Sequence, residues 1–279
     1  MSITRKTLRI EIGDDLHEGY SGTVPTSMPS GGDYFVDAAH IDPSESEQRW
    51  VGAWVIFTSG ANDGVERRIT AYDPTSGKFT LARAVAGGET PTYELHSLMS
   101  AKDMNTAINR ALARCPYETE VQITPVAGQL QYPLAAYTLI TDEGQVRRVF
   151  WREGATSYKY SYTNIPFRVE SVAGVLTLHI DPYAFGMGAS AKIILTYKAP
   201  YASLDTDVAT TLCPPSWVKA GAKLIMHDML IQQGSAQDTS KLERRRTEAA
   251  AEFGYQSACY APRMILRKQL GGCVEVYTP

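Results

Sequence analysis

Apolar residues recur at helical spacing in three parts of the chain, and each part is predicted to be helical. The first is Thr4–Leu16, the second begins at Ser100 and ends before Pro116, and the third is Pro214–Tyr260, a pair of helices joined by a short connection. A short connection between two helices favours antiparallel neighbours, so this last segment is expected to be a helical hairpin.

Two stretches between the helices show the short, alternating runs that are typical of β-strands. The first contains four runs, at Trp50–Thr58, Val65–Tyr72, Lys78–Val85 and Tyr93–Leu98, with turn signals at Asn62–Gly64 and Asp73–Gly77. The second extends from Glu120 to Lys198, with turns at Glu143-Gly144 and Ala173-Gly174. No helical segment fits between consecutive strands, so the sheets are expected to be antiparallel.

The predicted fold class is α+β, with antiparallel β modules combined with a helical hairpin and an extended C-terminal tail. Five segments follow from this order: residues 1–31 as an N-terminal helix and linker, 32–99 as a small antiparallel β module, 100–213 as a helix plus a second antiparallel β section, 214–260 as the hairpin, and 261–279 as the tail.

The tail, Ala261–Pro279, is too apolar for a solvated linker and too short to build its own core. We expect it to be extended and to dock on a partner. Its candidate partner-binding residues are Met264, Ile265, Leu266, Val274, Val276 and Tyr277.

Composition predicts a packed protein without a broad basic face. Apolar residues make up 44% of the chain, and 27 Lys and Arg oppose 30 Asp and Glu, which gives a net charge of −3. One local run, Arg244, Arg245 and Arg246, has two interpretations: a cationic rim facing nucleic acid or an acidic partner, or a solvated helix face paired with Glu243 and Glu248. The four cysteines match no zinc-binding spacing and are expected to be free thiols. No apolar run is long enough to cross a membrane. No secretion signal is expected in Met1–Ile10.

Motifs of catalysis are missing from the sequence, and neither an enzymatic activity nor a cofactor is expected. Gly186–Ala191 matches the letters of a dinucleotide-binding motif, but it precedes a strand where that motif requires a helix, so it is interpreted as a turn. The five histidines have no metal-ligand spacing, and Asp14-Asp15 lacks the further oxygen ligands that calcium requires. A pair of catalytic carboxylates brought together from distant strands stays open as an alternative.

Four segments carry a resemblance to a known family. Trp50–Gly60 and Glu66–Gly77 look like a β module of tailed-bacteriophage virion proteins, and they are followed by the helix segment Asn105–Ala111 and by Thr196–Leu204 before the hairpin. In this order of segments, roughly Thr4 to Tyr260, the chain resembles head-to-tail adaptor (connector) proteins.

The resemblance implies a ring of twelve copies bound beneath the portal protein, with helical hairpins around a DNA channel and a terminal tail docked on the portal. In this chain the matching parts are Ser216–Tyr260 and Arg263–Tyr277, and Arg244–Arg246 are the candidates to face the channel, where they would contact DNA without sequence specificity. The β module Gly32–Ser97 departs from the smaller adaptors and is expected to receive a tail or tail-fibre protein. Assembly in the host cytoplasm, incorporation into the virion and no membrane partner are implied.

Two rival functions remain open. Another phage role, in the tail tube, baseplate or fibre attachment, would use the same β modules without a portal-docking tail. A polysaccharide depolymerase would use carboxylates that the sequence does not single out. An adhesive cell-surface module is disfavoured, because no secretion signal is expected.

Overall fold

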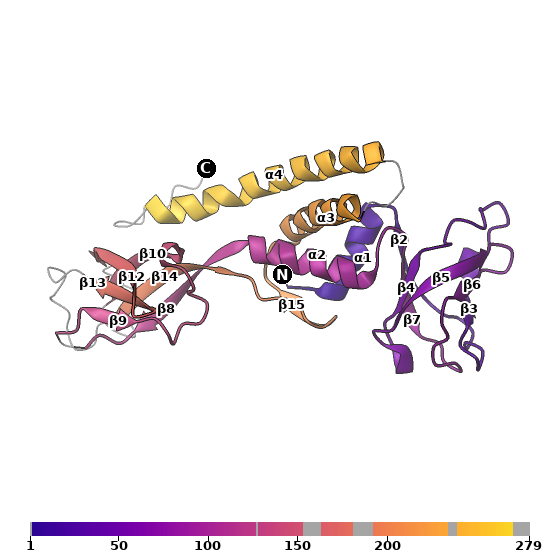
Figure 1. Ribbon diagram of the computed structural model, residues 1–279, viewed down its shortest axis with the longest axis horizontal. Coiled ribbons are helices and arrows are strands. Elements are labelled where there is room, and N and C mark those ends of the chain that lie inside the picture. Colours follow the sequence, from indigo (N-terminus) through magenta and orange to yellow (C-terminus); the bar gives the residue numbers. More distant parts are fainter. Residues whose placement is uncertain (1, 127, 153–162, 181–191, 234–238, 270–279) are drawn as a thin grey trace. The chain divides into compact units, whose positions relative to one another are not determined.

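The computed structural model describes residues 2–126, 128–152, 163–180, 192–233 and 239–269. The chain divides into two compact units, which are described separately: the first is Met1–Ala111 with Ala202–Gly254, and the second is Leu112–Tyr201 with Tyr255–Pro279. All described strand pairs are antiparallel, and helices are combined with four sheets (Figure 1). The predicted α+β class is confirmed.

Helix α1, Arg5–Asp15, begins where its sequence predicts. The Thr4 side chain caps it by accepting a hydrogen bond of 3.1 Å from the backbone N–H of Thr7. Leu8 and Ile12, from the predicted apolar stripe, are fully buried. A short pair of strands, β1 (Ile3–Thr4) with β15 (Thr210–Thr211), precedes this helix.

Helix α2, Ala101–Arg114, has two caps of different origin. Ser100 Oγ accepts a bond of 3.0 Å from the backbone N–H of Asp103, as the capping-box spacing predicts. The carboxylate of Glu66, the first residue of strand β5 (Glu66–Asp73), accepts a hydrogen bond from the backbone N–H of Ala101, a partner that the local sequence does not indicate. The predicted apolar face of α2 is buried: Met104, Ala107, Ile108, Ala111 and Leu112.

Helices α3 (Pro215–Gln232) and α4 (Thr239–Gln269) form the predicted antiparallel hairpin. Trp217 packs against Phe253, with ring centroids 4.9 Å apart, and Asp228 pairs with Arg246. The residue later in α3 therefore contacts the residue earlier in α4, which is the pattern of antiparallel helices. Helix α4 does not end at Tyr260, where the tail was expected to become extended. Its helical backbone continues to Gln269, since the residues after Pro262 are mostly strong helix formers such as Met, Leu, Arg and Lys.

The first β module is a six-stranded arrangement in the order β2-β7-β4-β5-β6-β3. Its strands are β2 (Gly19–Thr23), β3 (Tyr34–Val36), β4 (Trp54–Phe57), β5 (Glu66–Asp73), β6 (Lys78–Leu81) and β7 (Thr92–His96). Two short 3-10 helices, η1 (Ala38–His40) and η2 (Gly60–Asn62), lie in the connections. Buried aromatic rings dominate the core, which includes Phe35, Phe57, Tyr72, Phe79 and Tyr93.

Strand β2 corrects the expectation that residues 1–31 contain only a helix and a linker. It pairs with β7 over its whole length, from Gly19 opposite His96 to Thr23 opposite Thr92. The glycines that suggested a linker have a packing reason, because a Cβ at Gly19 would lie 2.8 Å from the Cα of Gly13 on α1. Close approach of a strand to a helix requires glycine at such points.

The second unit contains two antiparallel sheets. The four-stranded sheet, in the order β11-β10-β14-β8, comprises β8 (Pro116–Ile123), β10 (Val146–Arg152), β11 (Thr163–Asn164) and β14 (Lys192–Pro200). The three-stranded sheet, β12-β13-β9, comprises β9 (Gln131–Pro133), β12 (Phe167–Val172) and β13 (Val175–Ile180), and the 3-10 helix η3 spans Glu143–Gln145. Ala173 and Gly174 both have positive φ, 51° and 81°, and form the predicted turn between β12 and β13. Apolar side chains of both sheets share one core, which includes Ile123, Tyr132, Val149, Leu178, Ile193 and Leu195.

Candidate functional site

The arginine run on α4 is the sequence candidate that the structure describes in most detail. Arg244 points to solvent with 82% of its side chain exposed, and its Nε donates to Glu248 Oε1 at 3.0 Å, one helical turn away. This is the helix-face pairing of the second interpretation, and such an exposed pair stabilises a helix only slightly.

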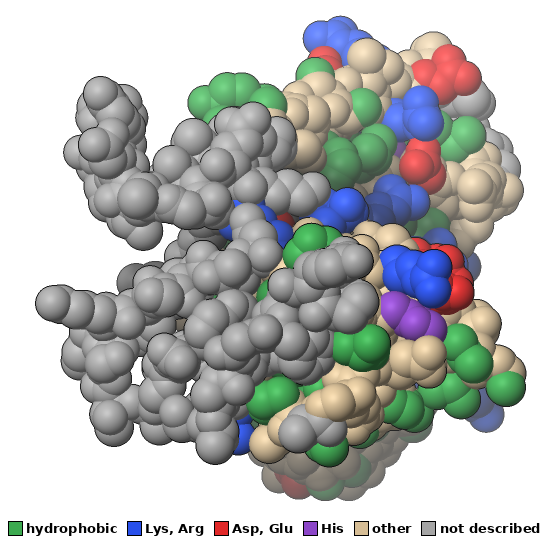
Figure 2. Space-filling view, turned by 90° about the vertical axis from the view of Figure 1, so that its left-hand side faces the viewer, with side chains coloured by type: hydrophobic (Ala, Val, Ile, Leu, Met, Phe, Trp, Pro, Cys, Tyr) green, Lys and Arg blue, Asp and Glu red, His purple; other side chains and the backbone are tan. Residues whose placement is uncertain are grey.

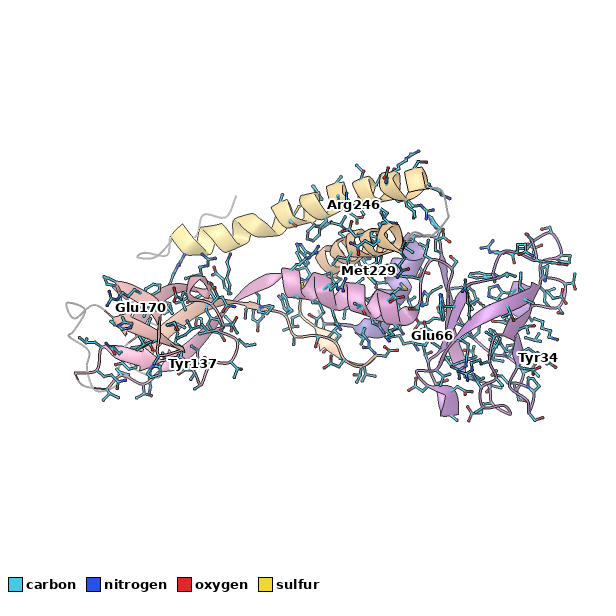
Figure 3. The ribbon with its side chains drawn as sticks, in the orientation of Figure 1. Tyr34, Glu66, Tyr137, Glu170, Met229 and Arg246 are labelled. Atoms are coloured by element: carbon cyan, nitrogen blue, oxygen red, sulfur yellow. The ribbon has the colours of Figure 1, made fainter. Side chains whose placement is uncertain are left out.

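The other two arginines reach different elements. The Nε of Arg246 donates to Asp228 Oδ1 on α3 at 2.5 Å, which ties the two helices of the hairpin together (Figure 3). Arg245 turns toward Glu18, the residue before β2, with its Nη1 and Nη2 at 3.4 and 3.5 Å from the same oxygen, Oε1. The three side chains therefore do not form one cationic surface.

A pocket of about 430 Å³ lies where Arg245 turns inward. We call it the α4 pocket. Four of its lining residues are apolar, and the rest are polar or charged: Glu18, Gln48, Arg49, Val51, Ala53, Ser97, Leu98, Lys241, Leu242 and Arg245. All of them belong to the first unit, so the pocket is a feature of one compact body. Three cationic side chains face one carboxylate there.

A buried guanidinium holds the elements that carry the pocket walls. Arg9 on α1 is completely buried, and all five of its N–H donors are used, because five hydrogen bonds leave its guanidinium. Two go to Glu94 on β7, at 2.6 and 2.9 Å, two to Asp207 at 3.0 and 2.8 Å, and one to Asn105 on α2 at 2.9 Å. We call Arg9 with Glu94, Asp207 and Asn105 the Arg9 clamp. It fixes α1 against β7, and the chain continues directly from these two elements to Glu18 and Ser97.

The clamp controls the charge of its carboxylates. Burial opposes ionisation of Glu94, but hydrogen bonds from His96 and Arg9 outweigh it and lower the pKa of this carboxyl. Burial opposes ionisation of Asp207 as well, yet Arg9 and Arg5 bring its pKa down to about 2. Both groups are therefore carboxylates at neutral pH, matched by the two arginines.

A second set of ion pairs joins α1 to the hairpin. Lys223 on α3 lies 3.4 Å from Asp15 on α1 and 2.8 Å from Glu252 on α4, and Lys219 lies 3.2 Å from Glu11. These contacts hold the helices of the first unit in one bundle.

The structure describes the backbone of only three of the six candidate tail residues. Met264, Ile265 and Leu266 belong to the helical backbone of α4. Val274, Val276 and Tyr277 lie outside the described residues. Partner binding by these six side chains stays a prediction.

Single-sequence reasoning missed the α4 pocket and the Arg9 clamp. Glu18 and Arg245 are 227 positions apart, and Arg9 and Glu94 are 85 apart. No local motif links residues at such separations. The one local hint is that Arg9 lies next to the buried Leu8 on a helix whose apolar stripe is narrow.

Among the described residues, no group of three or more His, Cys, Asp or Glu side chains is placed to hold a metal ion. On the face shown in Figure 2, the described Lys and Arg side chains are interspersed with Asp, Glu and apolar ones, without a large field of one sign. Three cationic side chains, two of them paired with glutamates, line one small volume at the α4 pocket.

Comparisons with known proteins identify no relative: no protein-family model matches the chain, and no curated protein does.

No helix among the described residues combines the length and the apolar character needed to span a bilayer.

Proposed function

We propose that the chain is a structural virion protein of a tailed bacteriophage, the head-to-tail adaptor. In this role twelve copies form a ring that joins the portal to the tail around the DNA channel, after assembly in the host cytoplasm. The proposal starts from the resemblance of four sequence segments, and the α+β fold with a helical hairpin is consistent with it.

The observation that carries the proposal is the unequal length of the hairpin helices. Helix α4 has 31 residues and α3 has 18. At 1.5 Å per residue these helices are about 46 and about 27 Å long. Because α3 is shorter by about 20 Å, it does not cover α4 along its whole length. Tyr255, with 68% of its surface exposed, begins the part of α4 beyond the first unit.

The part of α4 that α3 does not cover is a suitable surface for the next copy in a ring. A heterologous contact between two different surfaces of the same chain closes into a ring when the rotation per copy is right. Many weak contacts of this kind then act together, so each need contribute little.

The test is native mass spectrometry of the purified chain, alone and with portal rings of the same virus. We expect a complex that contains twelve adaptor chains per portal ring, and negative-stain images that place the added mass on the ring axis. A chain that stays monomeric and unbound beside intact portal rings would refute the proposal.

Deletion variants make the test sharper. A chain that lacks Ala261–Pro279 is expected to stay folded, with its helical circular dichroism signal reduced only by the loss of residues 261–269 of α4, and to lose portal binding. Arg244→Gln is the matched control, since it changes an exposed side chain of the same helix and should leave binding intact.

A further inference from the structure

We propose that the α4 pocket binds a phosphate-type oxyanion. The proposal goes beyond the adaptor function and does not depend on ring formation. It rests on the side chains that line the pocket, of which Arg49, Lys241 and Arg245 are cationic and only Glu18 is anionic. The lining therefore carries two net positive charges.

Arg245 is the central residue, because its present ion pair is weak. Both of its terminal nitrogens share Glu18 Oε1, at 3.4 and 3.5 Å. Charge-assisted hydrogen bonds of a guanidinium are normally 2.7–2.9 Å long, and a carboxylate usually receives the two N–H groups on two oxygens. Only 29% of the Arg245 side chain is exposed, so water does not fully compensate for the long contacts. An oxyanion that approaches Arg245 would gain short bonds.

Glu18 is occupied elsewhere. Its second oxygen, Oε2, accepts a hydrogen bond of 2.5 Å from Ser97 Oγ. The hydroxyl of Ser97 is also 3.2 Å from the backbone carbonyl oxygen of Glu18. Ser97 thus holds the carboxylate and leaves Arg245 with only one shared oxygen.

The other two cations of the lining come from two different segments, the stretch before β4 and the first turn of α4. Arg49 is positioned by Glu45, 2.8 Å from its Nη1, and by the ring of Trp50, 5.3 Å from its guanidinium carbon, while 55% of its side chain stays exposed. Lys241, in the first turns of α4, is exposed and forms no ion pair or hydrogen bond with the described residues. A preorganised guanidinium and a free ammonium are the groups that bind phosphate most often.

Charge favours phosphate over carboxylate as the ligand. Two net positive charges match a phosphomonoester, which carries about −1.5 to −2 at neutral pH, better than a carboxylate, which carries −1. Val51, Ala53, Leu98 and Leu242 form an apolar part of the lining, and the volume of about 430 Å³ is within the usual range of small-molecule pockets. Two ligands present phosphate oxygens of this kind: a small phosphomonoester of nucleotide size, whose charge matches the lining, and the phosphodiester backbone of DNA, in which each phosphate carries one negative charge and several can contribute.

The experiment is isothermal titration calorimetry of the full chain at fixed ionic strength with three probes. These are inorganic phosphate, a nucleoside 5′-monophosphate, and a short DNA oligonucleotide without terminal phosphates. Binding of the monophosphate assigns the site to small phosphomonoesters, and binding of the oligonucleotide alone assigns it to the DNA backbone. Heat from none of the three probes at millimolar concentration overturns the proposal.

Variants with opposite expected signs exclude a general charge effect. Arg245→Gln should weaken binding at least about tenfold, because it removes charge-assisted hydrogen bonds. Glu18→Gln should strengthen binding, because it removes the only negative charge of the lining. Arg110→Gln, which removes an exposed arginine on α2 that does not line the pocket, should leave binding unchanged.

Two results would contradict the site. If Arg110→Gln weakens binding as much as Arg245→Gln does, the anion is held by diffuse charge and not by the pocket. If Glu18→Gln weakens binding, the pocket does not receive an anion. Circular dichroism of each variant checks that it is folded, and the Glu18→Gln result remains decisive if Arg245→Gln does not fold.

Discussion

Arg9 and Glu94 are joined by two parallel hydrogen bonds, Nε to Oε2 at 2.6 Å and Nη2 to Oε1 at 2.9 Å, and neither side chain has more than 1% of its surface exposed. The pair connects the first helix to the last strand of the β module. Both charges are removed from water, so either one would destabilise the fold if its partner were missing.

Replacing only one partner should destabilise the first unit strongly. Arg9→Met leaves the carboxylate of Glu94 buried without its main counter-charge, and the expected loss is about 3–5 kcal/mol in the free energy of unfolding. Urea unfolding followed by tryptophan fluorescence measures it.

Two comparisons test the reason. The double variant Arg9→Met with Glu94→Leu should recover much of the loss, because no unpaired charge remains. Arg244→Met, which breaks an exposed pair, should change stability by less than about 0.5 kcal/mol. Equal losses in Arg9→Met and in the double variant would show that packing, and not charge, is responsible.

Asp207 predicts how stability depends on acid. Its pKa falls from 3.8 to about 2 in the folded chain, so the folded state binds this proton less readily than the unfolded state. The stabilisation is complete above about pH 4 and is lost as the pH falls toward 2.

Urea midpoints measured between pH 5 and pH 2 should therefore fall steadily. Asp207→Asn should lower stability at pH 5 and make the dependence less steep, since this carboxyl no longer titrates. An unchanged slope in this variant would show that other carboxylates cause the acid sensitivity.

Local signals explain which parts of the fold were predictable. Thr4 and Ser100 cap helices because their hydroxyls satisfy free backbone N–H groups, a chemistry that is complete within four residues. The turn at Asp73 to Gly77 is equally local, since Asp73 accepts hydrogen bonds from Thr75 and Ser76. Elements of this kind were placed correctly from sequence.

Tertiary partners explain the rest. Strand β2 has the composition of a turn, and it is a strand only because β7 pairs with it and Gly13 allows it to approach. The α4 pocket depends on Glu18, Arg49 and Arg245, which three distant segments supply. The end of α4 was misplaced because its apolar residues after Tyr260 were interpreted as a docking strand, although most of them also favour helix.

His227 on α3 predicts a second pH dependence, in a different range. Burial lowers its pKa from 6.5, and the neighbouring Arg245 and Lys223 lower it further, against the opposite effect of Asp228 and Glu248. Its Nδ1 is buried without a hydrogen-bond partner in the described residues. The folded state therefore prefers the neutral ring, and stability is complete above about pH 6.5 and falls as the pH drops below it.

Thermal unfolding between pH 8 and pH 5.5 tests this prediction. The midpoint should fall with pH in the wild-type chain and less steeply in His227→Gln. His40, whose pKa is also lowered by burial, should account for the slope that remains, so His227→Gln with His40→Gln should be nearly flat in this range. A slope that both substitutions leave unchanged would exclude the two histidines as its source.

Gly77 and Gly64 offer a matched pair for the turns of the first β module. Both have positive φ, 64° and 77°, so alanine at either position adopts a left-handed conformation that costs about 1–2 kcal/mol. Their surroundings differ: a Cβ at Gly77 would lie 2.2 Å from the backbone oxygen of Asp37, whereas a Cβ at Gly64 would meet nothing within 4 Å. Gly77→Ala should therefore cost about 1–3 kcal/mol more than Gly64→Ala in urea unfolding, because backbone must move to relieve the clash. Equal losses would mean that the backbone next to Asp37 moves without cost. The loss would then come only from the positive φ that both positions share.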